Sequence, residues 1–365
     1  MISKRVRNIE ESGIRKIFNL VSQNRDEYVD LSIGNPHFEV PEELKAAAKK
    51  AIDENRNAYS PTMGIVELRK KIADKLKSEN GIDASFEDVM LTLGVSGGLT
   101  LAFSACFDEG DEVIVADPYF VLYKQILDYL GVDIVFLNTY PDFHIDARKL
   151  EELVTPRTKG IILNSPNNPT GAVYSKEELE EVVAVARLHD ILIISDEVYE
   201  KFDYQKKFFS VGSIYEKTLT LGGFSKSHFV TGWRVGFAHG PNEIIEAMNK
   251  LQQYTFVCAP TPFQYALTEE FDVSNEKEAD EYKENGEFVY EKLKNKYELS
   301  IPEGAFYVFV KIPEDRPDFV QELLDEKLVV VPSEVFSRNK GYFRLSFAIS
   351  KENLEKGVDI LLKKC

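Results

Sequence analysis

Short, nearly continuous runs of apolar residues recur through the middle of the chain and alternate with longer segments of mixed polarity. Such runs are typical of strands covered on both faces, because a half-exposed strand would alternate apolar and polar residues. The pattern predicts seven strands, at residues 89–93, 112–116, 134–137, 160–163, 191–195, 218–221 and 234–238.

The segments between these runs have the periodicity of amphipathic helices. In residues 176–189 the apolar side chains recur at positions i, i+3, i+4 and i+7, namely Leu179, Val182, Val183 and Ala186. Ser175 precedes this segment and Glu178 follows three residues later. That spacing predicts a capping box at the start of the helix.

Repeated strand–helix–strand units predict a mostly parallel sheet, since right-handed crossovers place the helices on its faces. The pattern changes towards the C-terminus, where a charged helical segment at 276–296 precedes short strands at 306–310, 329–331 and 342–346. We therefore expect an α/β fold. Its large domain would carry a mostly parallel seven-stranded sheet covered by helices, and a smaller α+β domain would accompany it.

The composition of the chain mainly excludes certain classes of partner. The chain has 365 residues, with 44 Lys and Arg against 61 Asp and Glu, which gives a formal net charge of −17. An acidic surface repels polyanions, so we expect neither nucleic acid nor an anionic membrane as a partner. A single core rarely grows beyond ~250–300 residues, so the length agrees with two domains.

The residues at the N-terminus and the spacing of the cysteines bear on the cellular compartment and on whether a metal is bound. Residues 1–8 are basic and polar, without the apolar core of a signal peptide, and no apolar run approaches the roughly 18 residues of a membrane span. Cys106, Cys258 and Cys365 are far apart and form no C-x-x-C pair, so they indicate neither a zinc site nor a disulfide framework. We expect a cytoplasmic protein without a metal.

Small, polar and ionisable residues follow five of the predicted strands. Open α/β sheets bind ligands outside the carboxyl ends of their strands, so these segments are the candidate site. They are 94–98 (Gly-Val-Ser-Gly-Gly), 117–120 (Asp-Pro-Tyr-Phe), 164–171 (Asn-Ser-Pro-Asn-Asn-Pro-Thr-Gly), 196–199 (Asp-Glu-Val-Tyr) and 222–226 (Gly-Gly-Phe-Ser-Lys).

Two nucleotide-binding schemes compete for these segments. The apolar run that ends at Asp196 is similar to a Walker B strand, but the chain has no G-x-x-x-x-G-K-[ST] phosphate loop, which rules out a P-loop ATPase. In a dinucleotide fold, residues 94–98 would cradle the phosphates and Asp117 would stand near the place of a ribose-binding acid. The spacing is G-x-x-G-G rather than G-x-G-x-x-G, and Lys226 has no role in that scheme, so it stays the weaker alternative.

Lys226 stands at the end of a buried strand, with Arg234 close behind it. A lysine in a partly desolvated pocket near another cation loses basicity and becomes a nucleophile for carbonyl groups, forming a Schiff base. Pyridoxal phosphate needs such a lysine. It also needs an acid at its pyridine nitrogen, a phosphate cradle, a flat partner for its ring and donors to its phenolic oxygen. The strand ends offer a candidate for each.

Several motifs are similar to those of the class I aminotransferases, pyridoxal-phosphate enzymes of fold type I that include the aspartate and aromatic aminotransferases. They occur in family order, at 31–38 (LSIGNPHF), 58–69 (AYSPTMGIVELR), 163–171, 195–199, 223–236 (GFSKSHFVTGWRVG), 302–308 (PEGAFYV) and 341–348 (GYFRLSFA). The resemblance implies that the small domain is formed from both chain ends. Residues 40–275 would then form the large cofactor-binding domain, and residues 1–39 and 276–365 the small domain.

The resemblance implies a role for each matching residue around the ring of pyridoxal 5'-phosphate. Lys226 would bind the cofactor as the internal aldimine, and Asp196 would hold its protonated pyridine nitrogen. Tyr199 and Asn168 would donate hydrogen bonds to the phenolic oxygen and lower the basicity of the imine. Phe120 would lie on the ring. The family also implies a cis peptide bond between Asn168 and Pro169.

The phosphate and the substrate would be held by further matching residues. The phosphate ligands implied by the family are the backbone of Val95 and the side chains of Ser96, Ser225 and Arg234, together with Tyr59 from the neighbouring subunit of a homodimer. Many relatives carry a serine at the position of Gly223, so one phosphate hydroxyl is missing. The substrate α-carboxylate would be bound by the residues Gly34, Asn168 and Arg344.

The implied reaction moves an amino group from an L-amino acid to a 2-oxo acid by a ping-pong mechanism. Lys226 would act as general base and then as general acid, and the preferred substrates would be of the aspartate or aromatic type. Two other functions stay open. One is a pyridoxal-phosphate-dependent C–S β-lyase that acts on cysteine conjugates. The other is a non-catalytic binding or regulatory relative, which the intact set of Lys226, Asp196 and Tyr199 disfavours.

Overall fold

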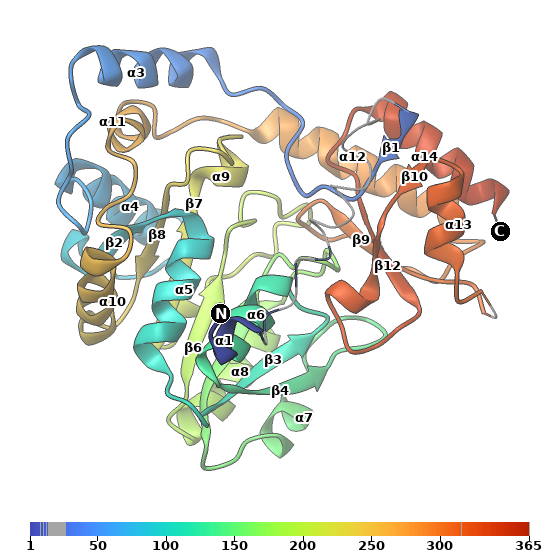
Figure 1. Ribbon diagram of the computed structural model, residues 1–365, viewed down its shortest axis with the longest axis horizontal. Helices are drawn as coiled ribbons and strands as arrows, with labels where there is room; N and C mark the ends of the chain where they lie inside the picture. Colours follow the sequence, from blue (N-terminus) through green and yellow to red (C-terminus); the bar gives the residue numbers. More distant parts are fainter. Residues whose placement is uncertain (8, 10, 12, 14–26, 315, 365) are drawn as a thin grey trace.

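The computed structural model describes residues 1–365 except for 8, 10, 12, 14–26, 315 and 365. Part of the expected small-domain segment 1–39, and Cys365, therefore lie outside the described residues. Figure 1 shows a central sheet between helices, with the orange and red C-terminal elements packed beside it. Among the described residues, no helix has the length and apolar character needed to cross a membrane.

The central sheet confirms the seven predicted strands. Its strands are β2 (Val89–Thr92), β3 (Glu112–Asp117), β4 (Asp133–Asn138), β5 (Thr158–Asn164), β6 (Leu192–Asp196), β7 (Thr218–Gly223) and β8 (Gly236–His239). Their order across the sheet is β2-β8-β7-β6-β5-β3-β4. All neighbouring pairs are parallel except those of β8, which runs antiparallel to both β7 and β2.

Both faces of the sheet are covered, which explains the continuous apolar runs. In β3, Val113 and Val115 pack into one core together with Leu99 and Met248, whereas Ile114 between them packs into another with Leu179. The surrounding helices are α1 (Lys4–Arg7), α3 (Glu42–Asp53), α4 (Val66–Ser78), α5 (Gly94–Cys106), α6 (Val121–Leu130), α7 (Ala147–Glu152), α8 (Lys176–Leu188), α9 (Phe224–Ser227), α10 (Asn242–Tyr254) and α11 (Thr261–Glu269).

Helix α8 begins as predicted. Ser175 Oγ accepts a hydrogen bond from the Glu178 N–H (3.2 Å), and the Glu178 carboxylate accepts one from the Ser175 N–H (2.9 Å). This reciprocal pair confirms the capping box. The prediction of a strand at 234–238 is partly wrong, because β8 begins only at Gly236. Arg234 has a φ of 55°, a left-handed conformation that a strand cannot contain.

The C-terminal part contains α12 (Glu276–Leu293), α13 (Phe319–Asp325) and α14 (Lys351–Lys363), with a three-stranded sheet of β9 (Tyr307–Lys311), β11 (Val331–Pro332) and β12 (Tyr342–Ser346). The strand predicted at 329–331 is in fact two. β10 (Leu328–Val329) pairs with β1 (Val29–Asp30), and β11 pairs with β12. Figure 1 accordingly shows blue β1 among the red elements. The domain boundaries at 40 and 275 stay predictions.

Candidate active site

One cavity of about 250 Å³ brings together the residues that the sequence singled out. All the predicted site residues line it except Tyr59: they are Gly34, Val95, Ser96, Phe120, Asn168, Asp196, Tyr199, Ser225, Lys226, Arg234 and Arg344. Tyr59 lies in the connection between α3 and α4, and its side chain is 83% exposed. Leu99, Asn164, Val198, Thr231 and Tyr307 complete the lining.

The strand pairing explains why distant segments meet here. Asn164, Asp196 and Leu221 are register partners at the carboxyl ends of β5, β6 and β7. Because β8 is antiparallel, its first residue, Gly236, stands at this same edge, opposite Gly223 and Thr92. The turns that leave β2, β5, β6 and β7 and the turn that enters β8 therefore all open into the cavity.

Asp196 presents a buried carboxylate to the cavity. It is 3% exposed and accepts hydrogen bonds from the Tyr123 hydroxyl (2.7 Å) and the Val198 N–H (3.3 Å). Burial raises the pKa of Asp196 to about 6, against the effect of these hydrogen bonds and of Lys226. A cation placed against this carboxylate would lower that pKa again, so Asp196 suits a protonated ring nitrogen.

Lys226 lies in the short helix α9, immediately after β7. Its ammonium donates a hydrogen bond to the carbonyl oxygen of Gly34 (2.7 Å). Desolvation, followed by the nearby charges of Arg234 and Arg344, lowers the pKa of Lys226 to about 8, and Asp196 only partly opposes them. The amine is therefore far closer to its neutral, nucleophilic form at neutral pH than an ordinary lysine.

A cradle for an anion lies at the N-terminus of α5. The first N–H groups of a helix have no partner within it and point towards its end. Arg234 lies beside them and donates hydrogen bonds to the carbonyl oxygens of Thr231 (3.0 Å) and Leu93 (3.3 Å). Gly94 has a φ of 63°, and a Cβ on it would lie 2.6 Å from Arg234 Nη2. Any other residue at position 94 would displace the guanidinium.

Arg344 places a second guanidinium deep in the cavity wall. Its side chain is 1% exposed and lies between the rings of Tyr307 and Phe336, each 4.5 Å from Cζ. It donates hydrogen bonds to Asn168 Oδ1 (2.9 Å) and to the carbonyl of Ser32, while Nε has no partner in the described structure. Among the described residues, no carboxylate forms an ion pair with Arg344. A buried cation in that state favours an incoming anion.

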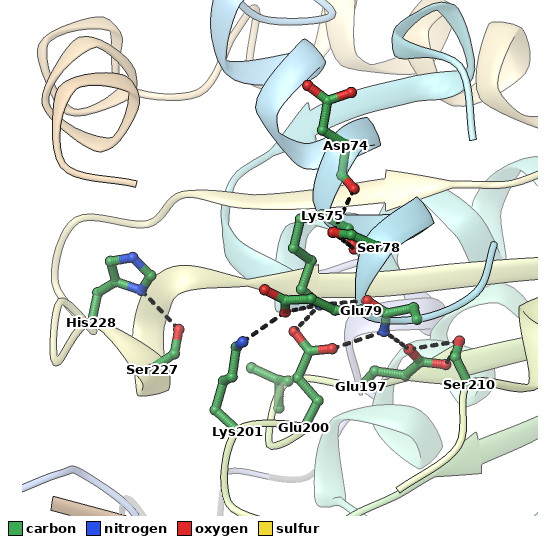
Figure 2. Close-up of polar contacts among 12 residues, drawn as sticks. Asp74, Lys75, Ser78, Glu79, Glu197, Glu200, Lys201, Ser210, Ser227 and His228 are labelled. Carbon is green, nitrogen blue, oxygen red and sulfur yellow. Dashed lines mark hydrogen bonds and ion pairs between the residues drawn. The ribbon is translucent and has the colours of Figure 1, made fainter. Parts of the chain in front are cut away.

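The turn after β6 is supported from behind by a second buried carboxylate. Glu197 accepts hydrogen bonds from Ser195 Oγ (2.9 Å) and Ser210 Oγ (2.7 Å), and burial together with the nearby Glu200 raises its pKa to about 7. Figure 2 shows Glu197 and Glu200 below α4, with Lys75 of that helix bound to Glu200. These contacts hold the backbone that carries Asp196 and Tyr199.

A larger cavity, of about 590 Å³, lies between α4, α9 and the start of α12. None of the predicted site residues lines it. Two of its lysines are engaged by its acids, since Lys75 binds Glu200 and Lys201 lies 2.7 Å from Glu79, as Figure 2 shows. Lys226 and the guanidinium groups of Arg234 and Arg344 lie instead in the smaller cavity.

Known proteins are similar to this chain in sequence and in fold. A family described as aminotransferase class I and II matches residues 26–361 of the chain. The chain belongs to this family. It is therefore an enzyme, an aminotransferase, as the motifs predicted.

Relatives of this aminotransferase match it over nearly the whole length of both chains. It is 36% identical to a probable aspartate aminotransferase of Methanocaldococcus jannaschii, over 99% of each chain. It is 37% identical to aromatic-amino-acid aminotransferase 2 of Thermococcus litoralis, over 99% of this chain and 97% of the other. The solved aspartate aminotransferase of Thermus thermophilus with maleate superposes with a TM-score of 0.94 and 35% identity, over 100% of both chains. These likenesses confirm the predicted α/β fold.

The family implies pyridoxal phosphate as the cofactor, and the described residues of the aminotransferase fit it. Asp196 matches a cationic ring nitrogen, and the Gly94 turn with Arg234 matches a phosphate. Lys226 supplies an amine of lowered pKa for the aldehyde. Arg344 lines the same cavity as a buried cation without an ion-pair partner among the described residues, which fits a carboxylate ligand.

Two contacts of the aminotransferase site were missed from sequence. Tyr123 bonds Asp196, and the Tyr307 hydroxyl lies 2.9 Å from that of Tyr199. The only sequence feature that could have indicated Tyr307 as a site residue is its place within the motif at 302–308. No sequence feature indicated Tyr123. The cis bond expected at Asn168–Pro169 is wrong. In the described chain the cis bonds precede Pro118, Pro141 and Pro166.

Proposed function

We propose that this aminotransferase transfers amino groups between L-amino acids and 2-oxo acids of the aspartate or aromatic type, with pyridoxal phosphate held in the 250 Å³ cavity. The observation that carries the proposal is that Lys226, Arg234 beside the proposed phosphate cradle and Arg344 at the proposed carboxylate site all line one cavity. Both cations lower the pKa of Lys226, so the amine is activated by the groups that would bind its two anionic ligands.

Each residue then has a defined task. When bound, pyridoxal phosphate supplies an aldehyde that reacts with amines and a ring that withdraws electrons from the carbon next to the amine. Asp196 keeps the ring nitrogen protonated, and Arg234, Ser96, Ser225 and the Val95 N–H hold the phosphate. Arg344 fixes the α-carboxylate, so that Lys226 Nζ can remove the α-proton and later return a proton as a general acid.

The side-chain preference can be tested with half-reactions. Among the described residues, the cations that line the cavity are Lys226, Arg234 and Arg344, whereas Leu99, Phe120 and Val198 contribute apolar surface. A second substrate carboxylate would meet no further cation among these residues, which costs about 1–3 kcal/mol, or roughly 5- to 150-fold in affinity. We expect phenylalanine to convert the yellow enzyme to its pyridoxamine form at lower concentrations than aspartate, measured by the loss of visible absorbance.

The same screen separates the alternative functions. Conversion that is reversed by adding a 2-oxo acid supports amino-group transfer. Release of pyruvate and ammonia from a cysteine conjugate, without any oxo-acid acceptor, would instead favour the C–S β-lyase. A protein that binds pyridoxal phosphate and converts no amino acid would contradict both enzymatic functions and favour the binding relative.

A homodimer with shared sites is the second part of the proposal. Tyr59 is exposed, and the chain beside it is tied to the end of α10, because Gln252 Nε2 donates to the carbonyl of Thr62 (2.7 Å). Tyr254 is 85% exposed, and Phe256 and Val257 are also exposed. Large exposed apolar side chains grouped in this way favour a protein partner. A second copy of the chain would bury them and bring Tyr59 to the neighbouring phosphate cradle.

Replacing Tyr59 with Phe should weaken pyridoxal phosphate binding by roughly 10- to 150-fold, because one hydrogen bond to a charged group is lost. Hybrid dimers that pair a Tyr59→Phe subunit with a Lys226→Ala subunit show whether the tyrosine acts in its own site or in the neighbouring one. If Tyr59 acts across the interface, each hybrid dimer contains one fully native site and binds cofactor with native affinity at that site. Cofactor titration of tagged, purified hybrids measures this. Weak binding at every site, or a monomer by light scattering, would contradict the shared-site dimer.

A further inference from the structure

Tyr307 joins three parts of the site and has no role in the function proposed above. It lies at the start of β9 and is 1% exposed. Its hydroxyl is 2.9 Å from the Tyr199 hydroxyl, and its ring lies against the Arg344 guanidinium, 4.5 Å from Cζ. A Cβ on Gly34 would lie 2.0 Å from the Tyr307 hydroxyl, so this hydroxyl also touches the backbone that accepts the Lys226 hydrogen bond.

The two phenols share one hydrogen bond, and either can donate it. The choice matters, because a Tyr199 that donates to Tyr307 has no proton left for a ligand in the cavity. The guanidinium over the ring of Tyr307 stabilises negative charge on that phenol, which makes it the stronger donor. Burial raises the pKa of both phenols, and Arg344 opposes that rise at both. The hydrogen bond between the phenols distinguishes them, since it lowers the pKa of Tyr307 and raises that of Tyr199.

We propose that Tyr307 is a positioning residue that donates its hydroxyl hydrogen bond to Tyr199. The Tyr199 proton is then directed into the cavity. The ring of Tyr307 also holds the Arg344 guanidinium flat. The inference rests on the proposed function, since it assigns the Tyr199 proton to the phenolic oxygen of pyridoxal phosphate. It goes further by linking the cofactor-facing phenol to the carboxylate site through one side chain. Arg344 Cζ is also 4.5 Å from the centre of the Phe336 ring, so a second ring helps to hold the guanidinium.

The Tyr307→Phe variant tests the donor direction, because it keeps the ring against Arg344 and removes only the hydroxyl. Tyr199 then loses the hydrogen bond that polarises and orients it, so its donation to the cofactor weakens. We expect the pH midpoint of the visible absorbance of the bound cofactor to rise by about one unit, the size of one ordinary hydrogen bond. The kcat should fall about fivefold to tenfold, while KM for the amino acid changes less than about threefold.

The opposite donor direction predicts the opposite sign. If Tyr199 donates to Tyr307 in the native protein, removal of the acceptor frees the Tyr199 proton for the cofactor, and the midpoint falls. A falling or unchanged midpoint would therefore overturn the inference. Failure of the proposed function is distinguishable, because native protein that gives no visible band with pyridoxal phosphate has no midpoint to shift.

Tyr215→Phe is the matched control. The Tyr215 hydroxyl is buried and donates to the carbonyl of Ile191 (2.8 Å), at the end of β6 opposite to the cavity. Its loss should lower the melting temperature about as much as Tyr307→Phe does and leave the absorbance midpoint and kcat unchanged. Equal effects of both variants on all three quantities would show that Tyr307 is merely structural. Tyr307→Leu, which also removes the ring, should in addition raise KM for the amino acid about tenfold.

Discussion

The Lys226→Ala variant is expected to lose amino-group transfer by at least roughly 10²- to 10⁴-fold, the contribution of a positioned general base, and to lose covalent capture of the cofactor completely. Lys226 is the one amine that lines the described cavity, and its hydrogen bond to Gly34 holds it there. Single-turnover rates with an amino acid measure the first effect. Borohydride treatment followed by peptide mass spectrometry measures the second, since it fixes pyridoxal phosphate to the reacting lysine.

The lowered pKa gives the same residue a pH signature. The neutral amine is the reactive form, so capture rises with pH until the pKa is passed. With a pKa of about 8 in place of 10.5, about a tenth of Lys226 is neutral at pH 7, against about 0.03% of an ordinary lysine. Capture at Lys226 should level off just above pH 8. Surface lysines should continue to gain reactivity up to about pH 10.5.

Lys217→Ala is the control for this variant. Lys217 stands just before β7, at the end opposite to Lys226, and is paired with Asp190 on the surface. Its removal should leave turnover and capture unchanged. Turnover of Lys226→Ala within tenfold of the native rate, or capture on another lysine with the same pH profile, would refute the role of Lys226.

The seven central strands were predictable because each is buried on both faces, which leaves an apolar run with little polar interruption. The error at 234–238 has a local cause. Val235 and the residues after it continue the apolar pattern, but the pattern does not report that Arg234 takes a positive φ to bring its guanidinium over Gly94. β1 was not predicted, because two residues contain no period, and its pairing with β10 joins segments far apart in the chain.

The site could be predicted as far as strand ends determine it. Asp196 ends β6 and Lys226 follows β7, both in the parallel part of the sheet, and the topology brings such strand ends to one edge. The contacts of Tyr307 with Tyr199 and Arg344 could not be predicted, because they depend on how β9 packs against the turn after β6. The Gly34 contact likewise depends on the path of the N-terminal segment across the cavity. The sequence can therefore mark such residues as candidates but cannot predict which residues they contact.

Arg344→Gln is expected to remove the recognition of the α-carboxylate. A hydrogen-bonded buried charge pair is worth about 2–5 kcal/mol when one partner is deleted, so kcat/KM for an amino acid should fall roughly 30-fold to several thousand-fold. The loss should reside mainly in KM, because the guanidinium binds the carboxylate before and during the reaction. The affinity for pyridoxal phosphate should change less than about threefold, since its proposed phosphate cradle lies at Arg234 and α5.

A substrate amine that lacks the carboxylate distinguishes the loss of carboxylate binding from general damage to the enzyme. In the native enzyme, kcat/KM should be higher for phenylalanine than for 2-phenylethylamine by the factor that Arg344 contributes. The Arg344→Gln enzyme should lose this preference and still react with 2-phenylethylamine as the native enzyme does. Folding should survive, because the native guanidinium is buried without an ion-pair partner among the described residues, and a neutral amide removes that unfavourable charge. The surface variant Arg187→Gln, which loses contacts to Ile214, Glu216 and the ring of Tyr215 far from the cavity, provides the control. An Arg344→Gln enzyme that still favours the amino acid over the amine would place the carboxylate site elsewhere.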